Sequence, residues 1–137
     1  MLMAVVVAAG GVHLALGQEE EAKEPTRLGV VWSSGDPDVA YRVCFMYTYH
    51  AKKAGWFDEV RLIVWGPSSK LLSGSEVFQK KIAELQEAGV KVEACVVCAD
   101  SYGVSDQFRE MGIEVIPMGK PLSDRLKSDG DWKVITF

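Results

Sequence analysis

Two cysteines in this 137-residue chain, Cys95 and Cys98, have a spacing that could support chemistry. They form C-V-V-C directly at the end of a predicted strand, within GVKVEACVVCADSYG. A cysteine where a helix begins lies near free N–H groups and the positive end of the helix dipole, which favour the nucleophilic thiolate. A thiol three residues later can resolve a mixed disulfide or a persulfide on the first. We therefore predict that Cys95 is a nucleophile and that Cys98 is its resolving thiol.

The sequence argues against several other roles for this pair. Zinc would need two further ligands, and the remaining cysteine, Cys44, is predicted to lie in a helix core with His50 nearby. Heme attachment needs His after the second cysteine, where Ala99 stands. A thioredoxin motif would come earlier and follow an aromatic residue. The alternative that stays open is that both cysteines only pack, half-buried, near a strand end. No metal and no cofactor are predicted.

Small and hydroxyl-bearing residues surround the cysteine pair in the predicted loops. Ser34, Gly66 and Ser68 follow the first two predicted strands, and Ser101 and Tyr102 follow the cysteines. Reactive groups in open α/β sheets lie beyond the carboxyl ends of the strands. We expect these residues to form a shallow polar rim that offers hydrogen bonds to an anion or a sulfur atom. Ordinary turn and capping roles are the alternative.

Short apolar runs alternate with longer amphipathic runs from Arg27 onward. This alternation is typical of βα units around a mainly parallel sheet. The predicted strands are 28–32, 60–65, 90–95, 114–117 and 132–136, and the predicted helices are 37–55, 76–88, 104–111 and 121–127. Asp36 is predicted to cap the first helix, and Gly55 to end it. The sequence therefore predicts one α/β domain with a five-stranded sheet.

The first predicted helix is apolar nearly all round, which indicates that it buries more than one face. Tyr41, Phe45 and Tyr49 are expected to form one stripe, and a second is expected at positions 39, 43, 46 and 50. One helix on one sheet buries a single stripe. We therefore expect the aromatic stripe to contact another copy of the chain in a homo-oligomer.

The composition is that of one ordinary globular domain, with 48% hydrophobic and 25% charged residues. Its 15 Lys and Arg against 19 Asp and Glu give a formal net charge of -4. No basic surplus is present to neutralise a phosphate backbone, which excludes nucleic acid from the expected partners.

The N-terminus contains an apolar run, MAVVVAAGGVHLAL, followed by Gly17 and an acidic string. A membrane-spanning helix needs about 20 apolar residues, so this run fits the core of a secretory signal peptide better. We predict a signal peptide over 1–17, a polar linker over 18–26 and a domain over 27–137. The mature protein would be exported, to the periplasm, with no stable membrane span. If the run is instead a first buried strand, the protein would be cytoplasmic.

Four segments of the sequence carry a family resemblance: VVWSSGDPDVAYRV, EVRLIVWGPSSKLL, EAGVKVEACVVCADSYGV and MGIEVIPMGKPL. In these segments the sequence resembles the DsrE/DsrF-like family of small sulfur-relay proteins. The resemblance covers almost all of 27–137. It implies a flavodoxin-like three-layer α/β sandwich that assembles into trimers or hexamers. It also implies that the cysteine at the position of Cys95 accepts sulfur as a persulfide and passes it on. Cys98 matches no obligatory residue of the family.

Together, the cysteine pair and the resemblance predict a sulfur carrier or thiol-based sulfurtransferase with Cys95 as acceptor. Its partners would be a sulfur donor protein and a sulfur acceptor protein. Two alternatives stay open: an oligomeric, non-catalytic subunit that binds a small ligand or anion at the rim, and a periplasmic thiol-disulfide protein.

Overall fold

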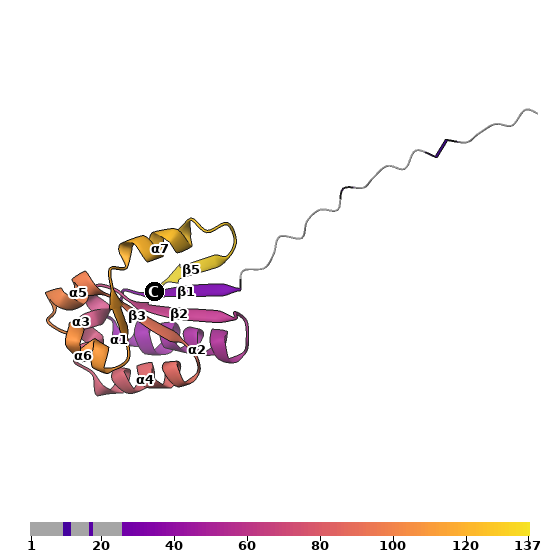
Figure 1. Cartoon of the computed structure of the whole chain (residues 1–137). Coiled ribbons are helices and arrows are strands. Elements are labelled where there is room, and N and C mark those ends of the chain that lie inside the picture. The colour runs from indigo at the N-terminus through magenta and orange to yellow at the C-terminus, as the bar shows by residue number, and fades with distance from the viewer. Residues whose placement is uncertain (1–9, 12–16, 18–25) are drawn as a thin grey trace, which may run out of the picture.

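The computed structural model describes residues 10–11, 17 and 26–137, and the strands of this part form one parallel sheet (Figure 1). The strands are β1 (Arg27–Trp32), β2 (Glu59–Val64), β3 (Lys91–Cys95), β4 (Glu114–Ile116) and β5 (Trp132–Thr136). Their order is β4-β3-β2-β1-β5, and every neighbouring pair is parallel. The predicted α/β class and the five predicted strands are confirmed.

Helices cover both faces of the sheet and give three layers. On one face lie α1 (Pro37–Val39), the π-helix η1 (Ala40–Phe45), α2 (Met46–Lys53) and α4 (Glu76–Glu87), with α6 (Ser105–Glu110) beside β4. The other face carries α7 (Gly119–Leu126) (Figure 1). Right-handed crossovers explain this division, because the chain steps from β1 to β4 in one direction and then returns past β1 to β5.

The larger core lies between the sheet and the helices η1, α2 and α4, where alternate residues of β1, β2 and β3 point inward. Its centre is aromatic. The Trp32 ring lies 4.8 Å from the Phe45 ring, and Phe45 lies 5.7 Å from Phe78, both edge-on. Such edge-to-face pairs stabilise the core beyond the area that they bury.

The π-helix η1 interrupts the first predicted helix. The whole segment nevertheless begins and ends as predicted. The Asp36 carboxylate accepts hydrogen bonds from the N–H groups of Asp38 and Val39, and Gly55 follows the last helical turn with φ +70°. Tyr41, Phe45 and Tyr49 line one groove, as their spacing predicts.

Within this aromatic stripe, Phe45 is not available to a second copy of the chain. Phe45 is only 3% exposed and belongs to the chain's own core, whereas Tyr41 is exposed. Phe45 does not lie on the surface for contact with a second copy. The other predicted stripe contains the exposed side chains, because Val43, Met46 and His50 face solvent.

Two short helices, α3 (Pro67–Ser73) and α5 (Val96–Ser101), stand where the sequence suggests loops. Both begin directly after a strand, at the carboxyl edge of the sheet (Figure 1). Pro67 occupies the first turn of α3, where the missing N–H costs no helical hydrogen bond.

The predicted signal peptide (1–17) and linker (18–26) lie outside the described residues except for Gly10, Gly11, Gly17 and Thr26. Within the part that the structure describes, no helix is both long and apolar enough to cross a membrane.

Candidate functional site

The segments that follow β1, β2 and β3 meet at the carboxyl edge of the sheet, beside both cysteines. A Cβ atom placed on Gly35 would lie 3.3 Å from the Cβ of Pro67, so the segment after β1 touches the start of α3. The Gly66 N–H donates a hydrogen bond to the Cys98 sulfur, which joins the segment after β2 to α5. This is the edge at which parallel sheets usually present reactive groups.

Cys95 is the last residue of β3 and the N-cap residue of α5. The alternation of β3 points Cys95 to the same face as Glu93, toward α7. There it packs with Val31, Ile63 and Met118 and is only 6% exposed. Its side chain makes no capping hydrogen bond to the first turn of α5. Cys95 is therefore a shielded thiol in an apolar cluster.

Cys98 lies one helical turn later and is more exposed than Cys95. It is half-buried and packs against the Cys95 cluster, and the two thiols are hydrogen-bonded to each other. Burial and the hydrogen bond to Cys95 raise the pKa of the Cys98 thiol, while the Gly66 N–H partly opposes the shift. Both cysteines are free thiols in this structure.

Gly66 lies in the left-handed region, with φ +65°, and this conformation aims its N–H at Cys98. A glycine adopts such a φ without strain. Of the residues predicted for the rim, Gly66 is the one whose N–H contacts a cysteine sulfur.

Two serines of the predicted rim form hydrogen bonds to other parts of the fold. The Ser34 N–H donates to the Phe137 carbonyl over 3.2 Å, and its hydroxyl accepts the Asp36 N–H. Ser68 is fully buried in α3, where its hydroxyl contacts the Trp32 carbonyl and accepts the Trp65 N–H. The expected rim position of Ser68 is therefore wrong, because its hydroxyl is buried between the end of β1 and the residue that follows β2.

Ser101 and Tyr102 follow the cysteines on the exposed end of α5. The Ser101 hydroxyl donates to the backbone carbonyl of Cys98 over 2.7 Å, rather than to its sulfur. Tyr102 is exposed beside the half-buried Cys98. Ser101 thus closes a helical turn, and Tyr102 leaves a hydroxyl-bearing ring at the surface near the site.

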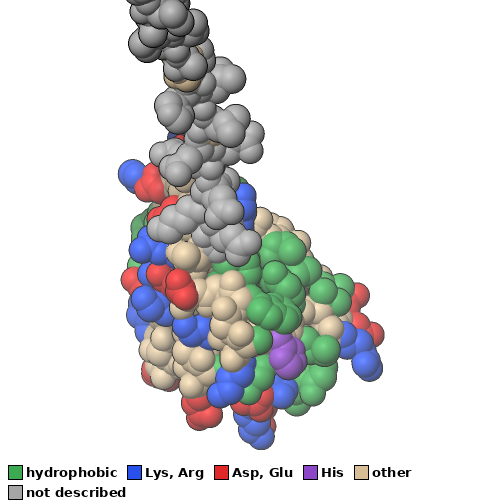
Figure 2. Space-filling model, turned by 90° about the vertical axis from the view of Figure 1, so that its right-hand side faces the viewer, with side chains coloured by type: hydrophobic (Ala, Val, Ile, Leu, Met, Phe, Trp, Pro, Cys, Tyr) green, Lys and Arg blue, Asp and Glu red, His purple; other side chains and the backbone are tan. Residues whose placement is uncertain are grey.

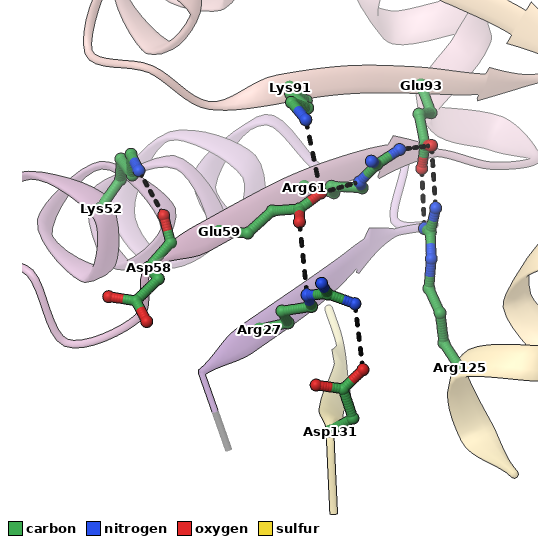
Figure 3. A network of polar contacts seen from close by, with 9 residues as sticks. All are labelled: Arg27, Lys52, Asp58, Glu59, Arg61, Lys91, Glu93, Arg125 and Asp131. Atoms are coloured by element: carbon green, nitrogen blue, oxygen red, sulfur yellow. Dashed lines mark hydrogen bonds and ion pairs between the residues drawn. The ribbon is translucent and has the colours of Figure 1, made fainter. Parts of the chain in front are cut away.

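A buried ion network lies on the same sheet face as Cys95 (Figure 3). Glu93, two residues before Cys95, is 1% exposed and accepts two hydrogen bonds from Arg125 of α7, at 2.7 and 2.8 Å. Arg61 of β2 adds a third at 2.5 Å. Burial opposes ionisation, but these two guanidiniums outweigh it and hold the pKa of Glu93 below its usual range.

This network is not among the residues predicted from the sequence, although the sequence contains one signal for it. Glu93 is a carboxylate in the middle of the apolar strand VKVEAC, and a buried carboxylate needs a cationic partner. The Trp132 ring completes the site, with the Arg125 guanidinium 4.7 Å from its centre. The network fastens α7 against the face that carries Cys95.

The third cysteine, Cys44, is fully buried, as the sequence predicts, and burial raises its pKa to about 12. Within the described ranges, no group of three or more His, Cys, Asp or Glu side chains is arranged to hold a metal ion. The reactive groups of the site are therefore the two thiols of β3 and α5.

Residues 26–137 match the model of the DsrE/DsrF-like family, which is most of the chain. The chain belongs to this family. Among solved structures, this DsrE/DsrF-like chain is similar to BT1422 from Bacteroides thetaiotaomicron, a conserved protein of unknown function. Their identity is 30% and the TM-score is 0.77, over 82% of this chain and 95% of BT1422.

A second solved structure, the ychN protein from E. coli, has the same fold at 17% identity. Its TM-score is 0.60, over 82% of this chain and 99% of ychN. A search of curated proteins found no match.

Proposed function

We propose that this DsrE/DsrF-like protein is a sulfur carrier that holds sulfane sulfur as a persulfide on Cys95. One observation carries the proposal: two free thiols touch at the carboxyl edge of a parallel sheet, one shielded and one partly open to solvent. Membership of a family of small sulfur-relay proteins supports the same chemistry. The partners would be a protein that donates sulfane sulfur and a protein that accepts it.

The surroundings of Cys95 suit storage. A persulfide is a reactive nucleophile, and the apolar cluster of Val31, Ile63 and Met118 would keep water and oxidants from its terminal sulfur. The transfer needs no cofactor. A donor R–S–SH gives its terminal sulfur to a thiolate of the protein and leaves as R–S⁻, so the overall reaction is a thiol exchange with no net oxidation.

The test is the mass of the intact protein after incubation with a low-molecular-weight persulfide donor. The wild type should gain one sulfur atom, and cyanide should remove it as thiocyanate. Cys44→Ala is the matched control and should gain the same mass, because Cys44 is buried in the other core. No gain in the wild type, or a cyanide-stable gain that Cys95→Ala retains unchanged, contradicts the proposal.

The anion-binding alternative loses support because Ser34 and Ser68 use their polar groups inside the fold. The thiol-disulfide alternative uses the same pair of cysteines and gives a different product. An intact mass that is lower by two hydrogen atoms, with no added sulfur, would identify this alternative, because a disulfide between the two cysteines has then formed.

We also propose that the chain assembles into a homo-oligomer, a trimer or hexamer, through the exposed face of η1 and α2. Figure 2 shows hydrophobic side chains gathered around a histidine on one face of the molecule. Met46, 54% exposed, separates two shallow grooves: one contains Tyr41 and Tyr49, and the other contains Val43 and Trp56. Apolar side chains on both sides of a ridge suit burial against a neighbouring copy of the chain.

The N-terminal sequence supports export as a further part of the proposal. A periplasmic location would place the two thiols in an oxidising compartment, where a sulfur donor must compete with disulfide formation.

A further inference from the structure

The two cysteines differ in how a donor can reach them. Cys95 has Val31, Ile63 and Met118 around it and Leu122 of α7 packed against the same cluster. Cys98 is half-buried on α5, and its neighbour Val97 is exposed to solvent. A donor persulfide that approaches the described surface therefore meets the Cys98 sulfur before the Cys95 sulfur.

The structure also gives Cys98 contacts on both sides of its sulfur. On the inner side it is hydrogen-bonded to the Cys95 thiol, and from the β2 side the Gly66 N–H points to it. The Gly66 N–H stabilises negative charge on Cys98, both when the thiolate attacks and when it leaves. These contacts are suited to a thiol that gains and then gives up a sulfur atom.

We propose that Cys98 is the outer thiol of a two-step relay, which receives sulfane sulfur from the donor and passes it inward to Cys95. This inference rests on the proposed function and assigns the direction of transfer within the site. It changes the role of Cys98 from a resolving thiol to a catalytic one, because Cys98 carries the transferred atom.

In the first step the Cys98 thiolate attacks the terminal sulfur of R–S–SH. The donor S–S bond breaks, and the donor leaves as R–S⁻, which takes up the proton that Cys98 released. In the second step the Cys95 thiolate attacks the terminal sulfur of Cys98–S–SH. The Cys98 thiolate leaves and takes the proton from Cys95. Both steps conserve electrons and need no external oxidant.

The burial of Cys95 means that inward transfer would protect the stored sulfur. Sulfur on Cys98 would be exposed to attack by water-borne nucleophiles, whereas sulfur on Cys95 lies under Met118 and Leu122. The return path to an acceptor is the reverse of loading, so Cys98 controls both entry and exit.

The experiment follows the intact mass over time with a low-molecular-weight persulfide donor, and then with cyanide as a small acceptor. Cys98→Ser and Cys98→Ala should load more slowly than the wild type by roughly tenfold or more, because the remaining thiol is buried. Cys95→Ala should load at least as fast as the wild type. It should then lose its sulfur to cyanide faster by roughly tenfold or more. Circular dichroism melting curves establish that each variant is folded.

The outcomes separate the two proposals. If the wild type gains no sulfur, the proposed function fails. If the wild type loads and both Cys98 variants load at the same rate, the relay is wrong and Cys95 accepts sulfur directly. Release of sulfide with formation of a Cys95–Cys98 disulfide also overturns the relay, because the second thiol then attacks the inner sulfur of the persulfide.

Discussion

Cys95 and Cys98 have the same chemistry but different surroundings, and the difference follows from local geometry. Cys95 ends a strand, so the alternation of β3 turns its side chain into the apolar cluster beneath α7. Cys98 lies in the first turn of α5. Its side chain therefore comes back beside the Cys95 sulfur and stays partly exposed. A C-x-x-C spacing at a strand-to-helix junction thus places one thiol above the other.

The raised pKa of Cys98 predicts how fast it reacts with iodoacetamide. Because burial and the hydrogen bond to Cys95 raise its pKa, little thiolate exists at neutral pH. The rate should keep rising with pH beyond about 8.5, the value of an ordinary thiol. Cys95→Ala removes one cause of the raised pKa, so it should speed alkylation of Cys98 at neutral pH. A rate that levels off at or below the ordinary thiol pKa would contradict this assignment.

The sequence predicts the cysteine pair and the three converging segments, because strand ends and small residues are local features. It does not predict which polar groups stay free. Ser34 and Ser68 look alike in the sequence, yet the Ser68 hydroxyl is buried against the Trp32 carbonyl. That outcome depends on how β1 and β2 align, which composition and spacing do not reveal.

Among the secondary-structure elements, α7 is the one that covers the proposed site. Met118 at its start and Leu122 within it pack on the Cys95 cluster, while Arg125 near its end binds Glu93. The helix is thus held at one end by apolar contacts and at the other by a buried ion pair. Losing either should expose Cys95.

Arg125→Met should lower the free energy of unfolding by about 3 kcal/mol, because it leaves a buried carboxylate with only one cation. It should also speed alkylation of Cys95 in a Cys98→Ala background. Lys120→Met is the control on the same helix, since the Lys120–Asp124 pair is exposed. It should change neither quantity measurably. Denaturant unfolding and mass spectrometry provide the readouts, and unchanged Cys95 alkylation in Arg125→Met would show that α7 does not restrict access.

The elements themselves were predictable to different degrees. Alternation and apolar runs predict the five strands well, and the signal is strongest in β1, β2 and β3, which are buried over most of their length. The π-helix was not predictable from periodicity, because the apolar spacing of this segment also fits an α-helix. Spacing also does not show how deep a side chain lies: Phe45 shares a groove with Tyr41, yet the structure buries it against Trp32.

At the scale of the whole molecule, the exposed face of η1 and α2 is the proposed interface between copies of the chain. Met46→Glu should reduce the oligomer to smaller species without lowering the stability of the subunit, because Met46 makes little contact within the chain. Phe45→Ala, by contrast, should destabilise the subunit by about 3 to 5 kcal/mol. Glu76→Lys on α4 is the control and should leave the assembly intact.

Light scattering and denaturant unfolding distinguish these variants. A wild type that is monomeric at micromolar concentration would show that the apolar face has no second copy as its partner. It would also leave the persulfide proposal unaffected, since both thiols belong to one chain.

The export proposal is tested by the N-terminus of protein taken from cells that express the full chain. Cleavage after a signal peptide of 17 residues would leave Gln18 as the first residue. An intact Met1 on mature protein in the cytoplasm would refute export.

The persulfide proposal is tested most directly by locating the sulfane sulfur within the loaded wild-type protein. After reaction with the low-molecular-weight persulfide donor, an alkylating agent caps every thiol and persulfide, and tandem mass spectrometry reads the peptide that contains both cysteines. We expect the additional sulfur atom on Cys95 at equilibrium. An additional sulfur found solely on Cys98 or Cys44, or on no cysteine, would contradict it.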